Sequence, residues 1–317
     1  IAEWLCPKSL SVVVICTMSS LRRLHTVERH LNSNLLNGKV AIISGSGQGI
    51  GAAAAKVFAT HGAKVVVSDI DVEKAEAVAK DIVALGADAI AMPGDVTDPT
   101  FADRVVAATI HKFGGLHYLI NNAGYTWDGM LHKTSDEQWE AMLAVHQTAP
   151  FRLIRAAAPY MRDAGKRGLA ELGQPEDRCI INVSSTSGTH GNLGQANYAT
   201  AKAGVLGLTK TICKEWGKFG VRCNAIAYGM IDTRLVRSKG DGEFMTVGGK
   251  KVAIGIPGGA SAKGGQPPSA DVGVGSSIPL GRAGTTIEAA NAMLMLCSPY
   301  STYISGQCLE VTGGSHI

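Results

Sequence analysis

The sequence lacks long apolar runs, metal-ligand spacings and dense basic clusters, and each absence argues against a class of protein. The apolar run over residues 10–16 is far too short to span a bilayer, so no membrane segment is predicted. Lysines and arginines do not cluster among aromatics and the net charge is only +4, which argues against a nucleic-acid partner. None of the nine histidines stands at a ligand spacing from another ligand type, so we assign no metal.

Cysteine is also sparse and scattered. The seven cysteines are odd in number and form no C-x-x-C pair. This usage is typical of reduced, mostly buried thiols in an intracellular protein. With 317 residues, of which 45% are hydrophobic and 18% charged, the chain can bury one large core.

The first 36 residues are predicted to lie outside the fold. The chain begins with Ile1, and the residues before Met18 are interpreted as a fragment or a mis-set translation start. From Met18 the sequence holds three arginines against one acid, which is compatible with a mitochondrial transit peptide and equally with a loosely helical extension. We therefore expect an extension over 1–36 and one catalytic domain over 37–317, in the cytoplasm or a mitochondrion.

A glycine-rich turn predicts a dinucleotide site. The apolar run KVAII, residues 39–43, leads into SGSGQGIG and then into a helical pattern. Glycines in such a turn let the backbone approach a pyrophosphate, which the free N–H groups and the dipole of a helix N-terminus attract. The candidate cofactor-binding residues of this turn are Gly45, Gln48, Gly49, Ile50 and Gly51.

The second predicted strand, residues 64–68, ends at Asp69. In a doubly wound sheet an acid at this point accepts hydrogen bonds from the adenosine ribose and repels a 2′-phosphate. Gln48 supplies no cation for such a phosphate. Both observations predict NAD rather than NADP as the cofactor, although a solvated turn acid is the alternative for Asp69.

Residues 180–208 bring three reactive side chains together. A strand-like run ends in two serines, and the following helical pattern places Tyr198 and Lys202 at i and i+4, on one face. Tyrosine, with a pKa of about 10, is a poor base at neutral pH, but a fixed cation at Lys202 would favour its phenolate. The hydroxyl of Ser185 can hold a substrate oxygen while the tyrosine gives or takes its proton. The alternative is an exposed lysine one turn from a half-buried tyrosine.

Together these motifs resemble the short-chain dehydrogenase/reductase family. YATAK corresponds to the family's Y-x-x-x-K, residues 44–51 to its T-G-x-x-x-G-x-G with serine for threonine, and residues 121–124 are its NNAG. The resemblance implies an α/β fold with a doubly wound parallel sheet of about seven strands flanked by helices. Tyr198 would be the acid/base, and Lys202 would also bind the nicotinamide ribose.

The resemblance also assigns further residues to the cofactor. It implies that Asp95 and Val96 border the adenine ring. It places the NNAG residues Asn122, Ala123 and Gly124 beside the cofactor, and it brings the backbone of Ile231 and the hydroxyl of Thr233 to the nicotinamide carboxamide.

Several segments depart from the family pattern. His146 replaces an asparagine whose backbone helps hold a water in a proton relay; a histidine can hold water and titrate near neutral pH, or it can be without catalytic consequence. Tyr228 replaces a proline, which is expected to loosen a turn. Residues 162–178 are interpreted as a surface insertion, and residues 234–282 as a long substrate loop with a hairpin through 245–254.

The predicted activity is hydride transfer between a nicotinamide and a secondary alcohol or ketone. GNLGQANYATAKAG is most similar to the 3-oxoacyl-carrier-protein reductase branch, so a 3-oxoacyl or 3-hydroxyacyl thioester is the expected substrate. These reductases commonly use NADPH, which Asp69 disfavours, so a dehydrogenase of another alcohol or ketone (steroid, sugar or polyol) stays open, as does a non-catalytic dinucleotide-binding regulatory protein. Apolar faces around 143–161 and 199–216 resemble the family's dimer and tetramer surfaces and predict a homodimer or homotetramer, although burial in the protein's own core is the alternative for these faces.

Overall fold

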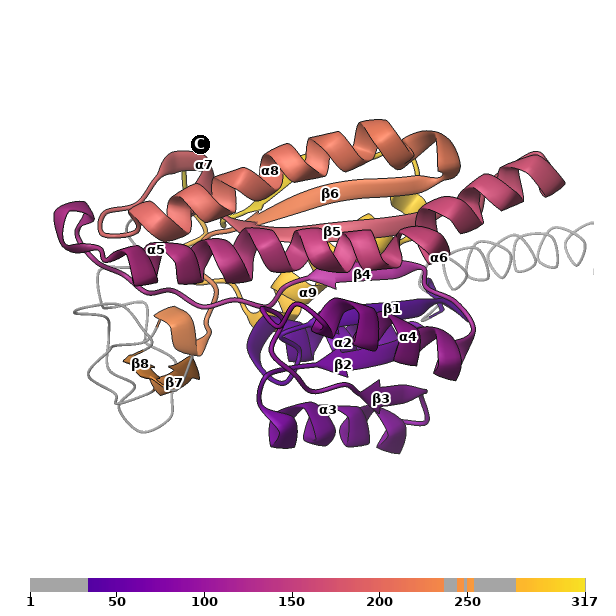
Figure 1. The fold of residues 1–317 in the computed structure, drawn as a ribbon, viewed down its shortest axis with the longest axis horizontal. Helices are drawn as coiled ribbons and strands as arrows, with labels where there is room; N and C mark the ends of the chain where they lie inside the picture. The colour runs from indigo at the N-terminus through magenta and orange to yellow at the C-terminus, as the bar shows by residue number, and fades with distance from the viewer. Residues whose placement is uncertain (1–33, 237–243, 248–249, 254–277, 317) are drawn as a thin grey trace, which may run out of the picture.

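A parallel sheet of seven strands forms the centre of the molecule (Figure 1). The computed structural model describes residues 34–236, 244–247, 250–253 and 278–316. Every neighbouring pair in the sheet is parallel, which confirms the predicted doubly wound fold. In spatial order the strands are β3 (Ala89–Ala91), β2 (Lys64–Ser68), β1 (Val40–Ser44), β4 (Tyr118–Asn121), β5 (Arg178–Ser185), β6 (Val221–Tyr228) and β9 (Cys308–Val311).

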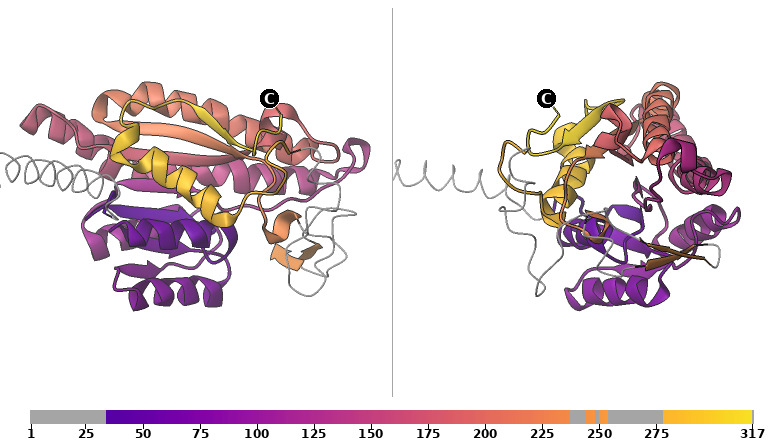
Figure 2. Two further views of the ribbon diagram at one scale, coloured as in Figure 1. Left: turned by 180° about the vertical axis from the view of Figure 1, so that it is seen from behind. Right: turned by 90° about the vertical axis from the view of Figure 1, so that its left-hand side faces the viewer.

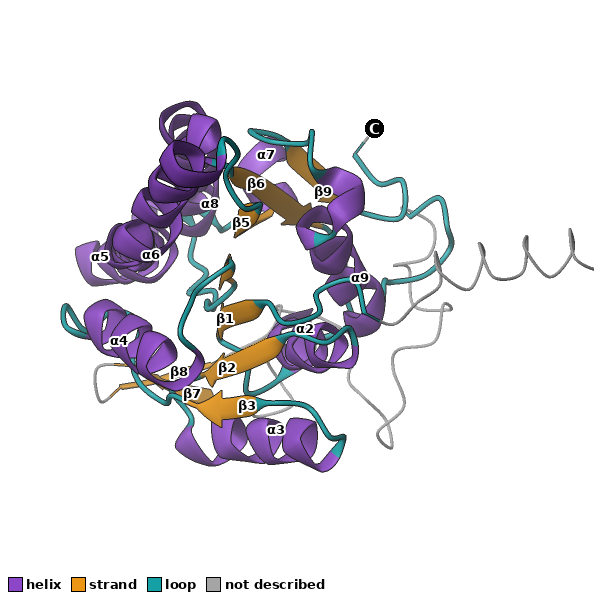
Figure 3. Ribbon diagram, turned by 90° about the vertical axis from the view of Figure 1, so that its right-hand side faces the viewer, coloured by secondary structure: helices purple, strands orange, loops and turns teal. Residues whose placement is uncertain are grey.

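Helices cover both faces of the sheet, as the end-on view in Figure 3 shows. One face carries α2 (Gly49–Thr60), α3 (Val72–Ala84) and α9 (Thr286–Cys297). The other face carries α4 (Phe101–Phe113), α6 (Ala149–Leu172) and α8 (Ala196–Trp216). Seen from behind, the yellow α9 crosses the sheet beside α2, against which it packs (Figure 2).

The strands read as continuous apolar runs because the sheet is buried on both faces. On β1, Ala41 and Ile43 pack with α2 and α9, whereas Ile42 between them packs with the α4 and α6 side. Parallel strands covered by helices on both faces need this pattern. The order reverses between β1 and β4, and in such sheets the ligand cleft opens at the carboxyl ends of the strands around this point.

The two helices on either side of His146 are joined without a break. Helix α5 (Asp136–Leu143) starts at a capping box formed by Ser135 and Gln138 and passes through one π-helical turn, η2 (Ala144–Thr148), into α6. A π turn inserts one extra residue into a helix and is frequent at functional sites. His146 lies in this turn.

The prediction of a surface insertion over residues 162–178 was wrong for its first part. Helix α6 continues to Leu172 and ends at Gly173, which adopts a left-handed conformation. Met161 and Gly165 continue its buried stripe, while the polar residues around them face solvent. The polar composition therefore reflects an exposed helix, whose last turns extend beyond the strand ends in Figure 1.

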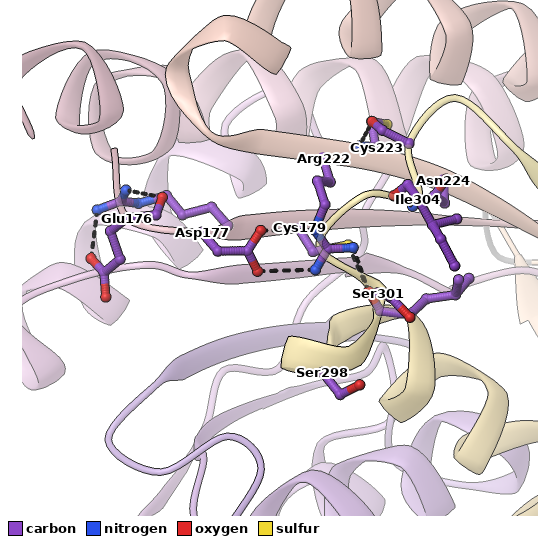
Figure 4. Close-up of polar contacts among 12 residues, drawn as sticks. Glu176, Asp177, Cys179, Arg222, Cys223, Asn224, Ser298, Ser301 and Ile304 are labelled. Atoms are coloured by element: carbon purple, nitrogen blue, oxygen red, sulfur yellow. Dashed lines mark hydrogen bonds and ion pairs between the residues drawn. The ribbon is translucent and has the colours of Figure 1, made fainter. Parts of the chain in front are cut away.

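A buried arginine fastens the amino end of β6 to its neighbours (Figure 4). The Arg222 guanidinium donates two hydrogen bonds to the Asp177 carboxylate, at 2.7 and 3.0 Å, and a third to the Leu296 carbonyl at the end of α9. Asp177 lies just before β5, so one side chain ties β5, β6 and α9 together. Charged groups are tolerated at such depth only when paired in this way.

Tyr228, at the end of β6, corrects the expectation of a loosened turn. Its ring is buried, and its hydroxyl donates a 2.7 Å hydrogen bond to the Ala289 carbonyl of α9. The end of β6 is thus held by this contact with α9, although it lacks the rigid ring of a proline.

The remaining predictions are partly covered by the described residues. Strands β7 (Phe244–Val247) and β8 (Lys250–Ala253) form the predicted antiparallel hairpin, while its Gly248–Gly249 turn and most of the predicted substrate loop lie outside the described residues. The cysteines that the structure describes are free thiols, three of them buried. Among the described residues, no helix is long and apolar enough to cross a membrane.

Candidate active site

A cavity of about 560 Å³ opens at the carboxyl ends of the strands. This is the size of a small-molecule site. Every candidate site residue of the sequence analysis lines it. The cavity residues predicted from sequence are Gly45, Gln48, Gly49, Ile50, Gly51, Asp69, Asp95, Val96, Asn122, Ala123, Gly124, His146, Ser185, Tyr198, Lys202, Ile231 and Thr233.

The glycine turn has no room for side chains where the backbone must come close. Gly45 has a positive φ of 64°, and a Cβ there would lie 2.7 Å from the Ala123 Cα. A Cβ on Gly51 would lie 2.1 Å from the Gly45 carbonyl oxygen. The N-terminus of α2 has neither a side-chain cap nor an acid in its first turn. This cradle of free N–H groups fits the pyrophosphate of a dinucleotide.

Asp69 is fixed at the end of β2 and is only 7% exposed. One carboxylate oxygen accepts the Gly47 N–H at 2.9 Å, and the other accepts the Asp71 N–H at 3.1 Å. Because a carboxylate has about four acceptor positions, capacity remains for ribose hydroxyls. The carboxylate thus lies beside the glycine turn, where the sequence predicts it.

Arg234 is a cavity residue that sequence reasoning missed. With the Gln48 amide oxygen turned toward it, the guanidinium donates hydrogen bonds of 2.8 and 3.2 Å. Gln48 was predicted to lie at a position without a cation, yet the fold brings one from η4 (Arg234–Val236), which follows β6. Its only sequence signal was its position directly after Thr233.

The NNAG segment links β1 to β4. The Asn122 amide donates to the carbonyls of Ser44 and Gly45, both at 3.0 Å, and the Ser44 hydroxyl accepts the Ala123 N–H at 3.1 Å. Asn121 donates to Asn182 on β5. The asparagines thus hold the glycine turn and the central strands in register.

Ser185, Tyr198 and Lys202 meet at the end of β5. Ser185 ends the strand, and its hydroxyl accepts the Ser187 N–H at 3.1 Å, which caps α7 (Thr186–His190). Tyr198 and Lys202 share one face of α8, with the Lys202 Nζ 5.6 Å from the centre of the Tyr198 ring. Lys202 is 4% exposed and donates to the Val183 carbonyl at 2.7 Å.

The predicted lowering of the tyrosine pKa is not produced by these side chains alone. Burial raises the pKa of Tyr198 to about 12, although a hydrogen bond with Ser185 lowers it in part. Burial also lowers the pKa of Lys202 to about 7. The Tyr198 phenolate and the Lys202 ammonium both lose hydration in the same pocket. Lys202 is therefore protonated to a smaller extent near neutral pH than the sequence led us to expect.

Comparison with known proteins identifies the chain. A family model described as short chain dehydrogenase matches residues 39–243, which is more than half of the sequence. The chain belongs to the short-chain dehydrogenase/reductase family. A second model, described as enoyl-(acyl carrier protein) reductase, matches residues 256–316. As a member of this family the protein is an oxidoreductase that binds a nicotinamide dinucleotide, in agreement with the predicted class.

Similar curated proteins cover nearly the whole chain. A 3-oxoacyl-[acyl-carrier-protein] reductase of Thermotoga maritima is 33% identical over 88% of this chain and 98% of its own. That of Vibrio cholerae is 34% identical over 89% and 99%. A 2,5-dichloro-2,5-cyclohexadiene-1,4-diol dehydrogenase of Sphingobium indicum is 36% identical over 89% and 98%.

One wall of this dehydrogenase cavity carries a polar network that sequence reasoning also missed. Gln195 donates to Asp128 at 3.1 Å and accepts from the Ser187 hydroxyl at 2.8 Å and the Asn192 amide at 3.0 Å. Gln195 lies three residues before Tyr198, within the quoted motif. No cluster of His, Cys, Asp and Glu that could hold a metal is present in the described part of the chain.

Proposed function

We propose that the protein transfers a hydride between NAD(H) and the oxygen-bearing carbon of a 3-oxoacyl or 3-hydroxyacyl thioester. One observation carries the proposal: Ser185, Tyr198 and Lys202 line the same cavity as the glycine cradle. A hydride donor and a proton donor must reach the two ends of one carbonyl group, and this arrangement brings both to one place.

The side chains have separate tasks in this reaction. Ser185 holds the substrate oxygen, and Tyr198 donates its proton to that oxygen as the carbonyl is reduced, or takes it back in the oxidation. Lys202 stabilises the phenolate that this transfer leaves behind and binds the nicotinamide ribose. The nicotinamide supplies or accepts the hydride when bound.

The choice of NAD rests on Asp69. Its carboxylate is fixed by two backbone N–H groups at the end of β2, where an adenosine ribose would lie. A 2′-phosphate would face this negative charge at close range. Arg234 offers a cation nearby, which would favour NADP, whereas Asp69 favours NAD. We assign the larger effect to the buried acid.

The thioester substrate is supported by the activity for which two relatives are named and by the rim of the cavity. Leu193 follows the cavity-lining Asn192, and the bridge between Gly129 and Gln195 brings Met130 and Leu131 alongside. All three apolar side chains are exposed. Exposed apolar side chains beside a pocket suit an acyl chain. The diol dehydrogenase relative favours a second candidate, a cyclic alcohol or ketone.

The proposal is tested with Tyr198→Phe. We expect the turnover of acetoacetyl thioester with NADH to fall on the order of 10²–10⁴-fold, because the proton donor is gone, while the Kd for NADH measured by fluorescence stays within about threefold. Unchanged turnover would refute the assigned mechanism. Turnover of a cyclic ketone but of no thioester would move the substrate to the second candidate.

A further inference from the structure

Arg234 brings a positive charge to the glycine turn from the other half of the sheet. It opens η4, which follows β6, and lies directly after Thr233. The Thr233 Cγ2 would lie 3.9 Å from a Cβ on Gly49, the first residue of α2. The Arg234 guanidinium reaches the Gln48 amide oxygen at 2.8 and 3.2 Å. It therefore stands beside the α2 N-terminus, where the pyrophosphate of a dinucleotide fits.

The backbone on both sides of Arg234 is fixed by hydrogen bonds. Before it, two backbone hydrogen bonds of 2.8 and 2.9 Å join residues 230–232 to Gly284. After it, the Val236 N–H donates to the Thr233 carbonyl at 3.1 Å. A group that is held in place before its ligand arrives loses less conformational entropy on binding.

The cavity offers a dinucleotide few positive charges. Of the lysines and arginines that the structure describes, only Arg234 and Lys202 line it. Lys202 lies at the catalytic end and donates to the Val183 carbonyl. The two linked phosphates of a dinucleotide carry two negative charges. In the described part of the chain, Arg234 is thus the cation available to them.

The charge of Arg234 is not taken up by a neighbouring acid. No carboxylate among the described residues forms a salt bridge with it, and the nearby Asp71 is paired with Lys74 at 2.7 Å. Gln48 is neutral and occupies two N–H groups of the guanidinium, which leaves further donors for a ligand. A guanidinium presents its donors in a plane that matches two oxygens of a phosphate group.

We propose that Arg234 is a cofactor-binding residue: Gln48 orients its guanidinium, which binds the dinucleotide pyrophosphate together with the N–H groups of α2. The inference rests on the dinucleotide binding of the family and does not depend on the proposed substrate. NAD and NADP share the pyrophosphate, so this contact does not choose between them. The neutral amide of Gln48 fixes the guanidinium without consuming its charge.

Arg234→Met removes the charge and keeps much of the length of the side chain. We expect the Kd values for NADH and for ADP-ribose, which keeps the pyrophosphate but lacks the nicotinamide, to rise equally, by about tenfold or more. Arg234→Lys should recover part of the loss, because lysine keeps the charge but not the planar donors. Arg167→Met removes an equal charge from the exposed last turns of α6 and should change neither Kd. Calorimetry measures each Kd without turnover, so the result is separate from the choice of substrate.

Gln48→Leu tests the orienting contact. We expect it to raise the Kd for ADP-ribose by about threefold in the wild-type background and to add nothing beside Arg234→Met, because the two residues act as a pair. Equal effects of Gln48→Leu in the two backgrounds would overturn the orienting role.

Unchanged Kd values for NADH and ADP-ribose in Arg234→Met would overturn the proposal. So would a loss confined to NADPH, because the guanidinium would then bind the 2′-phosphate. If Arg234→Met does not fold, the wild type still decides. Phenylglyoxal should modify Arg234, as peptide mass spectrometry detects, and ADP-ribose should protect it whereas adenosine, which lacks phosphates, should not. Absence of that protection would contradict the proposed contact.

Discussion

The amine of Lys202 is almost completely buried, so its protonation should make the free energy of unfolding depend on pH. Burial lowers its pKa from an ordinary 10.5 to about 7. Between these values the unfolded chain binds the proton and the folded chain does not, so the free energy of unfolding rises with pH across this window.

Urea unfolding of wild type and Lys202→Met tests this prediction. From pH 7 to pH 9 the wild type should gain stability relative to the variant by at most about 1.4 kcal/mol per pH unit. Lys210→Met, on the exposed side of the same helix, is the control and should follow the wild type. Parallel curves for wild type and Lys202→Met would mean that the buried lysine keeps its proton.

The Asp69 carboxylate should set cofactor preference. Replacing it with alanine removes the charge that a 2′-phosphate would face, so we expect the ratio of the Kd for NADPH to that for NADH to fall by about tenfold or more in Asp69→Ala. Glu73→Ala removes an equal charge from the exposed first turn of α3 and should leave the ratio unchanged. A ratio that stays constant in both variants would transfer cofactor selection to other residues, with Arg234 the first to examine.

At the scale of elements, helix α6 contains two glycines whose replacement by alanine should change the free energy of unfolding in opposite directions. A Cβ on Gly165 would lie 1.9 Å from the Phe219 carbonyl oxygen, whereas on Gly168 its nearest atom would be 3.6 Å away, an ordinary contact. Alanine is favoured over glycine in a helix by about 1 kcal/mol. Gly168→Ala should therefore raise the free energy of unfolding by up to that amount.

Gly165→Ala should instead lower the free energy of unfolding, since α6 must move away from the segment around Phe219. Urea denaturation of both variants measures the difference. Equal stabilisation by the two substitutions would show that the buried face of α6 is not closely packed against this segment.

The strands and most helices could be predicted because local pattern and tertiary environment agree. Buried β1 and β5 read as apolar runs, and glycine turns mark where helices begin. The C-terminal half of α6 was missed because its buried stripe is narrow and its polar surface resembles a loop. The contact of Tyr228 with Ala289 could not be inferred either, since it joins elements 61 residues apart.

At the scale of the whole molecule, exposed aromatic side chains support the expected self-association. Phe151 on α6 and Tyr303 before β9 are exposed, the latter completely. Oligomers commonly bury such groups at symmetric interfaces. Light scattering at micromolar concentration should give a dimer or tetramer, which Phe151→Asp or Tyr303→Asp shifts toward smaller species. A wild-type monomer would refute the expectation.

The site could be predicted better from sequence than its chemistry could. The sequence motifs predicted which residues meet in the cavity. Close approach of two backbones requires glycine, and an acidic residue directly after an apolar strand is visible in the sequence. Sequence does not reveal depth of burial, which moves the pKa values of Tyr198 and Lys202 in directions that disfavour charge. The hydrogen bonds between Arg234 and Gln48 likewise join residues far apart in the chain.

The most direct test of hydride transfer follows an isotope. The wild-type protein is incubated with NADH carrying deuterium at one face of C4 and with a panel of acetoacetyl thioester and cyclic ketones, and the products are analysed by mass spectrometry. The account predicts one deuterium on the new carbinol carbon of a product, from one of the two faces of C4 only. With Tyr198→Phe the label should enter on the order of 10²–10⁴-fold more slowly. Tight NADH binding without label in any product of the panel would contradict it.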